Sequence, residues 1–172
     1  MEPQTRMIER LWDLIQGNKE SLVEDAAGLK HERWPKPAGA YHMIEDANVF
    51  VASAASIQPG AVLDGSQGPV VIDHDAVIGA NAVLQGPCYI GPHAHLMPLT
   101  LIRPGTTIGM MCRIGGEVSN SIVFGYSNKA HDGYLGDSYI GKWVNLGAAT
   151  NTSNLKNTYG EISVMTPRGP EK

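Results

Sequence analysis

The stretch from Ile72 to Ile114 decides the fold, and it reads IDHDAVIGANAVLQGPCYIGPHAHLMPLTLIRPGTTIGMMCRI. Its large aliphatic markers recur at every sixth residue: Ile72, Ile78, Leu84, Ile90, Leu96, Ile102, Ile108 and Ile114. Four places after each marker stands a small or β-branched residue, such as Ala76 or Cys112. A period of six fits neither an α-helix nor a long strand. It indicates a chain that turns a corner every six residues, with a short strand between corners.

Three such strands close a triangular coil of eighteen residues, so Ile72, Ile90 and Ile108 should form one aliphatic column. Successive coils stack at a strand spacing of roughly 4.8 Å, and each buried aliphatic side chain contributes about 1.5–3 kcal/mol. The predicted fold class is all-β, a single-stranded left-handed parallel β-helix of hexapeptide repeats with a short N-terminal helical segment. Parallel crossovers are normally right-handed, so the handedness rests on resemblance to other hexapeptide-repeat proteins.

The rest of the chain divides around this rod. The expected segments are a helical part at 1–33, a linker or packing segment at 34–48, the β-helix at 49–165 with a polar loop at about 119–134, and a tail at 166–172. In the helical part, Ile8, Leu11, Trp12 and Ile15 share one face. Gly17-Asn18 is expected to break that helix, and KESLVEDA to form a second one. The nine-residue step from Leu63 to Ile72 predicts a small corner loop within the rod.

Composition narrows the functional classes. The net charge of −4 argues against a nucleic-acid partner, because such proteins are normally basic. No stretch is apolar for long enough to insert into a bilayer, and the N-terminal residues lack the apolar run of a signal peptide. Cys88 and Cys112 both occupy the small interior position, so we expect buried thiols and not a disulfide framework. These features predict a cytoplasmic location.

Three histidines on the rod raise the question of a metal. His93 and His95 flank the interior Ala94 and should point outward, and His74 lies about one coil away. Proteins of the γ-carbonic anhydrase class, which share this fold, bind zinc through three histidines, so a zinc-dependent hydratase is a minor alternative. That class pairs two histidines five residues apart, and the pairing is missing here. We therefore expect surface histidines and no metal in the β-helix.

A second group of residues lies towards the C-terminal end of the rod. His131 stands in the run SNKAHDGYLGD, which is followed by Val144-Asn145-Leu146-Gly147-Ala148 and then by Asn154. Upstream lie Arg103-Pro104-Gly105 and Glu117. Together these motifs resemble the acetyltransferase domain of the GlmU family, bifunctional N-acetylglucosamine-1-phosphate uridylyltransferases and glucosamine-1-phosphate acetyltransferases. The resemblance covers about residues 50–160. The wider pattern is similar to GlmU-like sugar nucleotidyltransferase proteins, in which a nucleotidyltransferase domain precedes a helical linker like IERLWDLIQGN.

The resemblance implies an acetyl transfer from acetyl-CoA, as co-substrate, to an amino-sugar phosphate in nucleotide-sugar and cell-envelope precursor synthesis. His131 would be the general base, since histidine can take up the proton of an amino group near neutral pH. Arg103 would bind the sugar phosphate through its planar fork of donors. Hydrogen bonds to the sugar and acetyl groups would come from Tyr134, Asn145 and Asn154. A homotrimer is implied as well, because the family builds its active sites between rods.

Alternative interpretations accompany these roles. Arg103 could simply be a solvated corner residue, and Asn145 with Asn154 could form a ladder that satisfies the corners. Ser119 stands where the family has a phosphate-binding lysine, and Lys129 and Lys156 are the candidates to replace it. These 172 residues contain neither the family's nucleotide-binding motif nor the later coils that form much of the acetyl-CoA groove. The alternative function is therefore a noncatalytic oligomerisation or regulatory β-helix, or a fragment, that acts with a nucleotidyltransferase domain or partner chain.

Overall fold

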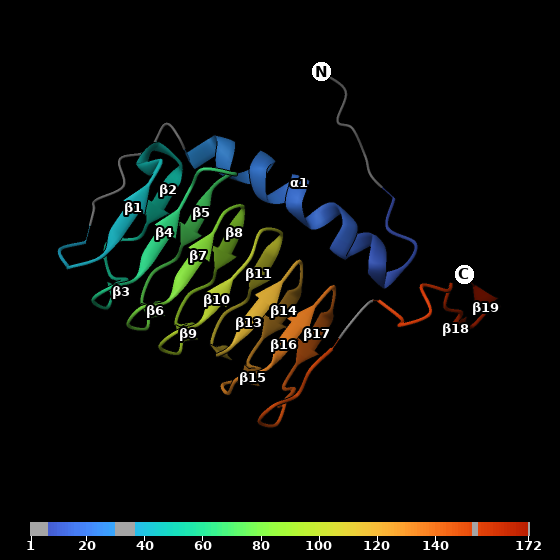
Figure 1. The fold of residues 1–172 in the computed structure, drawn as a ribbon. Coiled ribbons are helices and arrows are strands. Elements are labelled where there is room, and N and C mark those ends of the chain that lie inside the picture. Colours follow the sequence, from blue (N-terminus) through green and yellow to red (C-terminus); the bar gives the residue numbers. More distant parts are fainter. Residues whose placement is uncertain (1–6, 30–36, 153–154, 172) are drawn as a thin grey trace, which may run out of the picture.

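The computed structural model describes residues 7–29, 37–152 and 155–171, and it shows a parallel β-solenoid. In the described part of the chain, strands from successive coils pair in parallel to form three sheets, and a helix lies along one of them (Figure 1). A fourth, two-stranded sheet stands apart from the rod. The solenoid architecture predicted from the six-residue step is therefore confirmed.

Each sheet of the rod takes one strand from each coil. The first sheet holds β1 (His42–Ile44), β4 (Val62–Asp64), β7 (Val83–Gln85), β10 (Leu101–Ile102), β13 (Glu117–Ser119) and β16 (Tyr134–Gly136). The second holds β2 (Val49–Val51), β5 (Val70–Ile72), β8 (Cys88–Ile90), β11 (Thr106–Ile108), β14 (Ile122–Gly125) and β17 (Tyr139–Lys142). The third holds β3 (Ser56–Ile57), β6 (Val77–Ile78), β9 (His95–Leu96), β12 (Arg113–Ile114) and β15 (Asn128–Lys129).

The interior is a set of aliphatic columns, as the repeat predicts. Ile72 pairs with Ile90, Ile90 pairs with Ile108, and all three side chains are fully buried. Cys88 and Cys112 are buried free thiols in the same core. Desolvation by burial raises the pKa of Cys88 to about 12, so its thiol is inert at neutral pH.

The segment expected to be a polar loop at about 119–134 instead continues the coil, because it contains β14 and β15. The step between interior residues shortens here: Val118 takes the place of Ile102 one coil later, only four residues after Ile114. Val123 follows Ile108 in the same way. The corners of this part are shorter than those of the earlier coils, whereas the strands remain. A search at a fixed step of six residues therefore misses the strands after Ile114.

Both ends of the rod differ from the expected boundaries. The solenoid begins earlier than residue 49, since β1 and the 3₁₀ helix η1 (Asp46–Asn48) lie within the expected linker and β1 pairs with β4. At the other end, β18 (Val164–Thr166) and β19 (Gly169–Glu171) form an antiparallel hairpin outside the rod, so neither the β-helix boundary at 165 nor the tail is as expected.

The helix α1 (Leu11–Leu29) covers the second sheet, where its neighbours include β8, β11 and β17. It runs unbroken through Gly17 and Asn18, contrary to the predicted break. Gly17 is buried, and the Asn18 side chain donates to the Gly105 carbonyl at 2.7 Å and accepts from the Thr107 hydroxyl at 3.0 Å. These two residues are thus a contact point with the rod, where tertiary packing outweighs low helix propensity.

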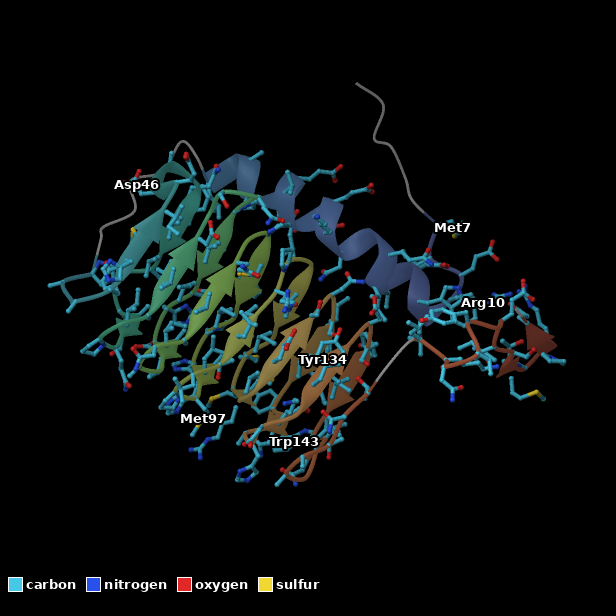
Figure 2. All side chains as sticks on the ribbon, in the orientation of Figure 1. Met7, Arg10, Asp46, Met97, Tyr134 and Trp143 are labelled. Carbon is cyan, nitrogen blue, oxygen red and sulfur yellow. The ribbon has the colours of Figure 1, made fainter. Side chains whose placement is uncertain are left out.

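Arg10, the residue just before α1, contacts the C-terminal hairpin. The Arg10 guanidinium donates to the Glu171 carboxylate at 2.6 and 2.7 Å, a two-point pair between residues far apart in sequence. Figure 2 shows Arg10 beside this hairpin, away from the rod. Of the predicted apolar face, Trp12 and Ile15 are partly buried, whereas Ile8 precedes the helix and is exposed. In the described ranges no helix has both the length and the apolar character needed to cross a membrane.

Candidate functional site

The turn that joins β15 to β16 carries His131, whose side chain is exposed. Lys129 stands two residues earlier and follows Ile114 in an interior column, with only 2% of its surface exposed. Its ammonium donates to the carbonyl oxygens of Gly115 at 2.7 Å, His131 at 3.1 Å and Gly133 at 2.7 Å. The buried ammonium therefore ties the His131 turn to the coil before it.

This geometry changes the role expected for Lys129. Its ammonium is directed inward and surrounded by carbonyl groups, so it is not placed to bind a substrate phosphate. Desolvation by burial lowers the pKa of Lys129, and the nearby Asp132 carboxylate opposes that effect. Because an unpaired charge is costly inside a core, the carbonyl groups are what make this position tolerable.

The same turn is fixed from the following coil. The Ala149 amide donates to the Asp132 carbonyl at 3.2 Å, and the Asn151 side chain accepts from the Tyr134 amide at 2.7 Å. Gly133 has a φ of +117°, and a Cβ there would clash with the Thr150 carbonyl. His131 is thus exposed at its side chain while its backbone is held by the coils on both sides.

Three predicted residues lie on or beside the first sheet. Tyr134 in β16 pairs with Glu117 in β13, and the Arg103 Nε makes an ion pair with the Glu117 carboxylate from the preceding coil. Tyr134 is partly exposed and lies on the side of the rod that faces the viewer in Figure 2. The structure therefore assembles Arg103, Glu117 and Tyr134 on one face, and His131 stands in the turn that enters this face.

The remaining predicted ligands lie elsewhere. Asn145 is exposed and forms a bridge with Asn128, which places it on the third sheet. Lys156 is outside the rod, and its ammonium donates to the Glu161 carbonyl at 2.7 Å. Asn154 falls outside the described residues. Within one chain the structure therefore does not bring Asn145 or Lys156 to the face that carries Tyr134.

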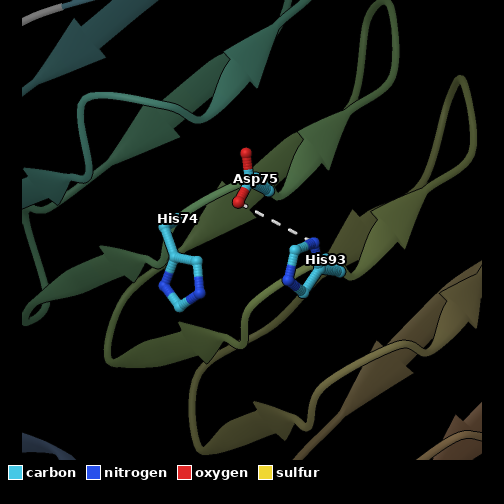
Figure 3. A group of neighbouring side chains, drawn as sticks. All are labelled: His74, Asp75 and His93. Carbon is cyan, nitrogen blue, oxygen red and sulfur yellow. Dashed lines mark ion pairs between the residues drawn. The ribbon is translucent and has the colours of Figure 1, made fainter.

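A separate group of polar side chains occupies the corner between the second and third sheets. One potential ligand atom from each of His74, Asp75 and His93 lies within 4.8 Å of the others, and all three side chains are exposed (Figure 3). His95, considered with them from the sequence, is instead in β9 and is not part of the group. Asp75 was not singled out from the sequence, although its eighteen-residue distance from His93 places both at the same corner of successive coils.

The coils, the interior columns and the repeat define a hexapeptide-repeat β-solenoid domain. No protein-family model matches the chain. It is similar to proteins described as bifunctional protein GlmU: 34% identical over 109 residues to that of Trichormus variabilis and 38% over 115 residues to that of Synechococcus elongatus, each match covering 62% of this chain and 23% of the relative. The GlmU of Desulfitobacterium hafniense is 32% identical over 138 residues, covering 65% of this chain and 29% of the relative.

These matches confirm the resemblance that the motifs predicted. The chain spans about a quarter of the length of the curated relatives it matches. The roles of individual residues, and any activity of the whole relatives, are therefore taken up as proposals below.

Proposed function

We propose that this domain is an acyltransferase that moves an acetyl group from acetyl-CoA to the amine of an amino-sugar phosphate, with His131 as the general base. The observation that carries the proposal is the exposed His131, held in a turn that enters the face with Arg103 and Tyr134, in a chain similar to GlmU proteins. The reaction would serve cell-envelope precursor synthesis in the cytoplasm.

The chemistry follows from the state of the acceptor. An amino sugar at neutral pH is largely an ammonium ion, and it attacks a thioester only after losing a proton. His131 would accept that proton, the amine would attack the acetyl carbonyl directly, and coenzyme A would leave as the thiol. A positioned base of this kind contributes about 10²–10⁴-fold to the rate. The hydrogen bonds from Lys129 to the His131 and Gly133 carbonyls support the role by fixing the backbone on which His131 stands.

Arg103 is the proposed phosphate ligand. Its Nε is engaged by Glu117, and this contact would orient the guanidinium with its two terminal nitrogens directed towards an anion. Tyr134 would hydrogen-bond the sugar from the neighbouring strand. Asn145 lies on a different sheet, so it would reach the acetyl group only from a neighbouring rod.

A homotrimer is part of the proposal for that reason. Exposed aromatic side chains support an interface between copies: Trp143 is 77% exposed and stacks on Tyr126 with ring centroids 4.9 Å apart, and Phe124 in β14 is 52% exposed. Figure 2 shows Trp143 at an edge of the rod. Light scattering coupled to gel filtration should give three chains per particle.

The test is release of thiol from acetyl-CoA in the presence of a panel of amino-sugar phosphates. Wild-type protein should turn over at least one of them, and His131→Ala should lose about 100-fold or more. His95→Ala is the matched control, because it removes a partly exposed histidine in β9, away from the His131 turn. If wild-type protein releases no thiol above background, the alternative stands: a noncatalytic oligomerisation or regulatory rod that works with a nucleotidyltransferase domain.

A further inference from the structure

The corner that follows β5 and β8 stacks the same turn in two successive coils. Asp75 and His93 occupy equivalent places, since each has a φ of +56° and follows its strand by three residues. The His93 amide donates to the His74 carbonyl at 3.1 Å, which fixes the two turns against each other. Residues that are one coil apart in sequence are thereby held side by side on a rigid backbone.

The three side chains of this corner face a common point, as Figure 3 shows. The His93 Nδ1 lies 3.8 Å from an Asp75 carboxylate oxygen, and the rings of His74 and His93 meet edge to face with centroids 5.4 Å apart. Two imidazoles and one carboxylate are thus converged on a site open to solvent.

One ligand is also oriented from outside the group. The Asp73 carboxylate contacts the His74 Nδ1 at 2.7 Å through one oxygen and accepts from the Tyr89 hydroxyl at 2.7 Å through the other. This contact favours the tautomer with the proton on His74 Nδ1, which leaves a lone pair on Nε2. Carboxylates that hold metal-binding histidines in this manner fix the tautomer and the ring orientation.

We propose that His74, Asp75 and His93 bind a divalent ion of the zinc class, with Asp73 as the residue that positions His74. Imidazole nitrogens suit zinc, copper and nickel, whereas magnesium and calcium prefer ligands made entirely of oxygen. Three protein ligands leave a fourth tetrahedral position for water. Metal–ligand bonds are about 2.0–2.2 Å long, so the ligand atoms must approach one another slightly, and exposed side chains have room to do so.

This site is independent of the proposed acetyl transfer. It lies on the corner between the second and third sheets, whereas His131 lies at a different corner, two coils after His93 and three after His74. None of its residues is among those proposed to bind the amino-sugar phosphate, so either proposal can fail without the other.

The experiment uses the untagged 172-residue chain, freed of metal with a chelator. Zinc affinity is measured by competition with a chromophoric indicator, and cobalt is the spectroscopic probe of ligand geometry. We expect one zinc ion per chain and a tetrahedral cobalt spectrum. Asp73→Asn should weaken zinc by about 10–100-fold, the usual cost of losing an outer-shell partner. His93→Ala should cost at least as much and abolish the cobalt spectrum.

Two further variants keep the result decisive. Asp75→Asn preserves shape and should weaken zinc as His93→Ala does, so a folding defect in one variant cannot be mistaken for loss of a ligand. His95→Ala removes a nearby, partly exposed histidine that is not part of the group and should bind like wild type. The proposal is overturned if wild-type protein shows no saturable one-to-one binding, if His93→Ala binds as tightly as wild type, or if His95→Ala weakens zinc equally.

Discussion

Replacing Lys129 with methionine tests how the coil near His131 is held together. The ammonium of Lys129 donates three hydrogen bonds, to the carbonyls of Gly115, His131 and Gly133. The Gly133 carbonyl also accepts from the Glu117 amide at 3.1 Å, so it keeps one donor after the substitution. The carbonyls of Gly115 and His131 lose the donor that the structure gives them.

The expected magnitude follows from these contacts. A buried carbonyl left without a donor costs about 1–3 kcal/mol, so two of them cost about 2–6 kcal/mol. Methionine fills most of the space and avoids the desolvation of an ammonium, which offsets part of that cost. We expect Lys129→Met to lower the free energy of unfolding by about 2–4 kcal/mol. Urea unfolding followed by circular dichroism, at one fixed protein concentration, measures it.

A second readout locates the effect. Amide hydrogen exchange should rise at Gly115 and Glu117, whose N–H groups donate to the Lys129 and Gly133 carbonyls. Lys19→Met is the matched control, since Lys19 is exposed on α1 and its loss should change stability by less than about 0.5 kcal/mol. The reasoning is refuted if Lys129→Met is as stable as wild type, because an aliphatic filler would then serve as well as the ammonium.

Three further results are expected. Ile90→Ala opens a cavity in an interior column and should cost about 2–5 kcal/mol in urea unfolding. Asn18→Ala removes the two side-chain hydrogen bonds that Asn18 makes to the rod and should cost about 1–2 kcal/mol, with faster exchange confined to α1 amides. The hydrogen bond from Arg10 lowers the pKa of Glu171. The contact between the hairpin and Arg10 is therefore fully present above the ordinary value of 4.5 and is lost as pH falls through the lowered pKa, which hydrogen exchange of the hairpin amides measures.

Each of these has its own control. Ile90→Val should cost only about 0.5–1.5 kcal/mol, and equal losses for the two variants would contradict the cavity argument. Exchange that rises throughout the rod in Asn18→Ala would show that the helix is not a separate docking unit. Glu171→Gln should loosen the hairpin at neutral pH and remove the acid transition, and a transition that persists would assign it to another carboxyl group.

The interior columns show which parts of the fold a sequence pattern can predict and which it cannot. The six-residue step predicted the column of Ile72, Ile90 and Ile108, because the interior of a coil accepts one large side chain per face and repeats it at every turn. The six-residue step loses the register after Ile114, where the corners shorten and Val118 follows Ile102 in the column of the first sheet. A corner is closed by backbone hydrogen bonds that many residue types can make. The number of residues in a corner is therefore difficult to predict from the sequence.

The candidate sites likewise have features that the sequence predicts and features that only the structure shows. The sequence by itself determined the solenoid, the buried cysteines and the likeness to GlmU proteins, because these depend on a periodic pattern or on a local motif. Only the tertiary structure decided that Lys129 points inward, that Asn145 lies on a different sheet from Tyr134, and that Asp75 meets His93. The direction of a polar side chain depends on its position in the coil and on the neighbouring coils. That direction is set by the length of each corner, which only the folded chain shows.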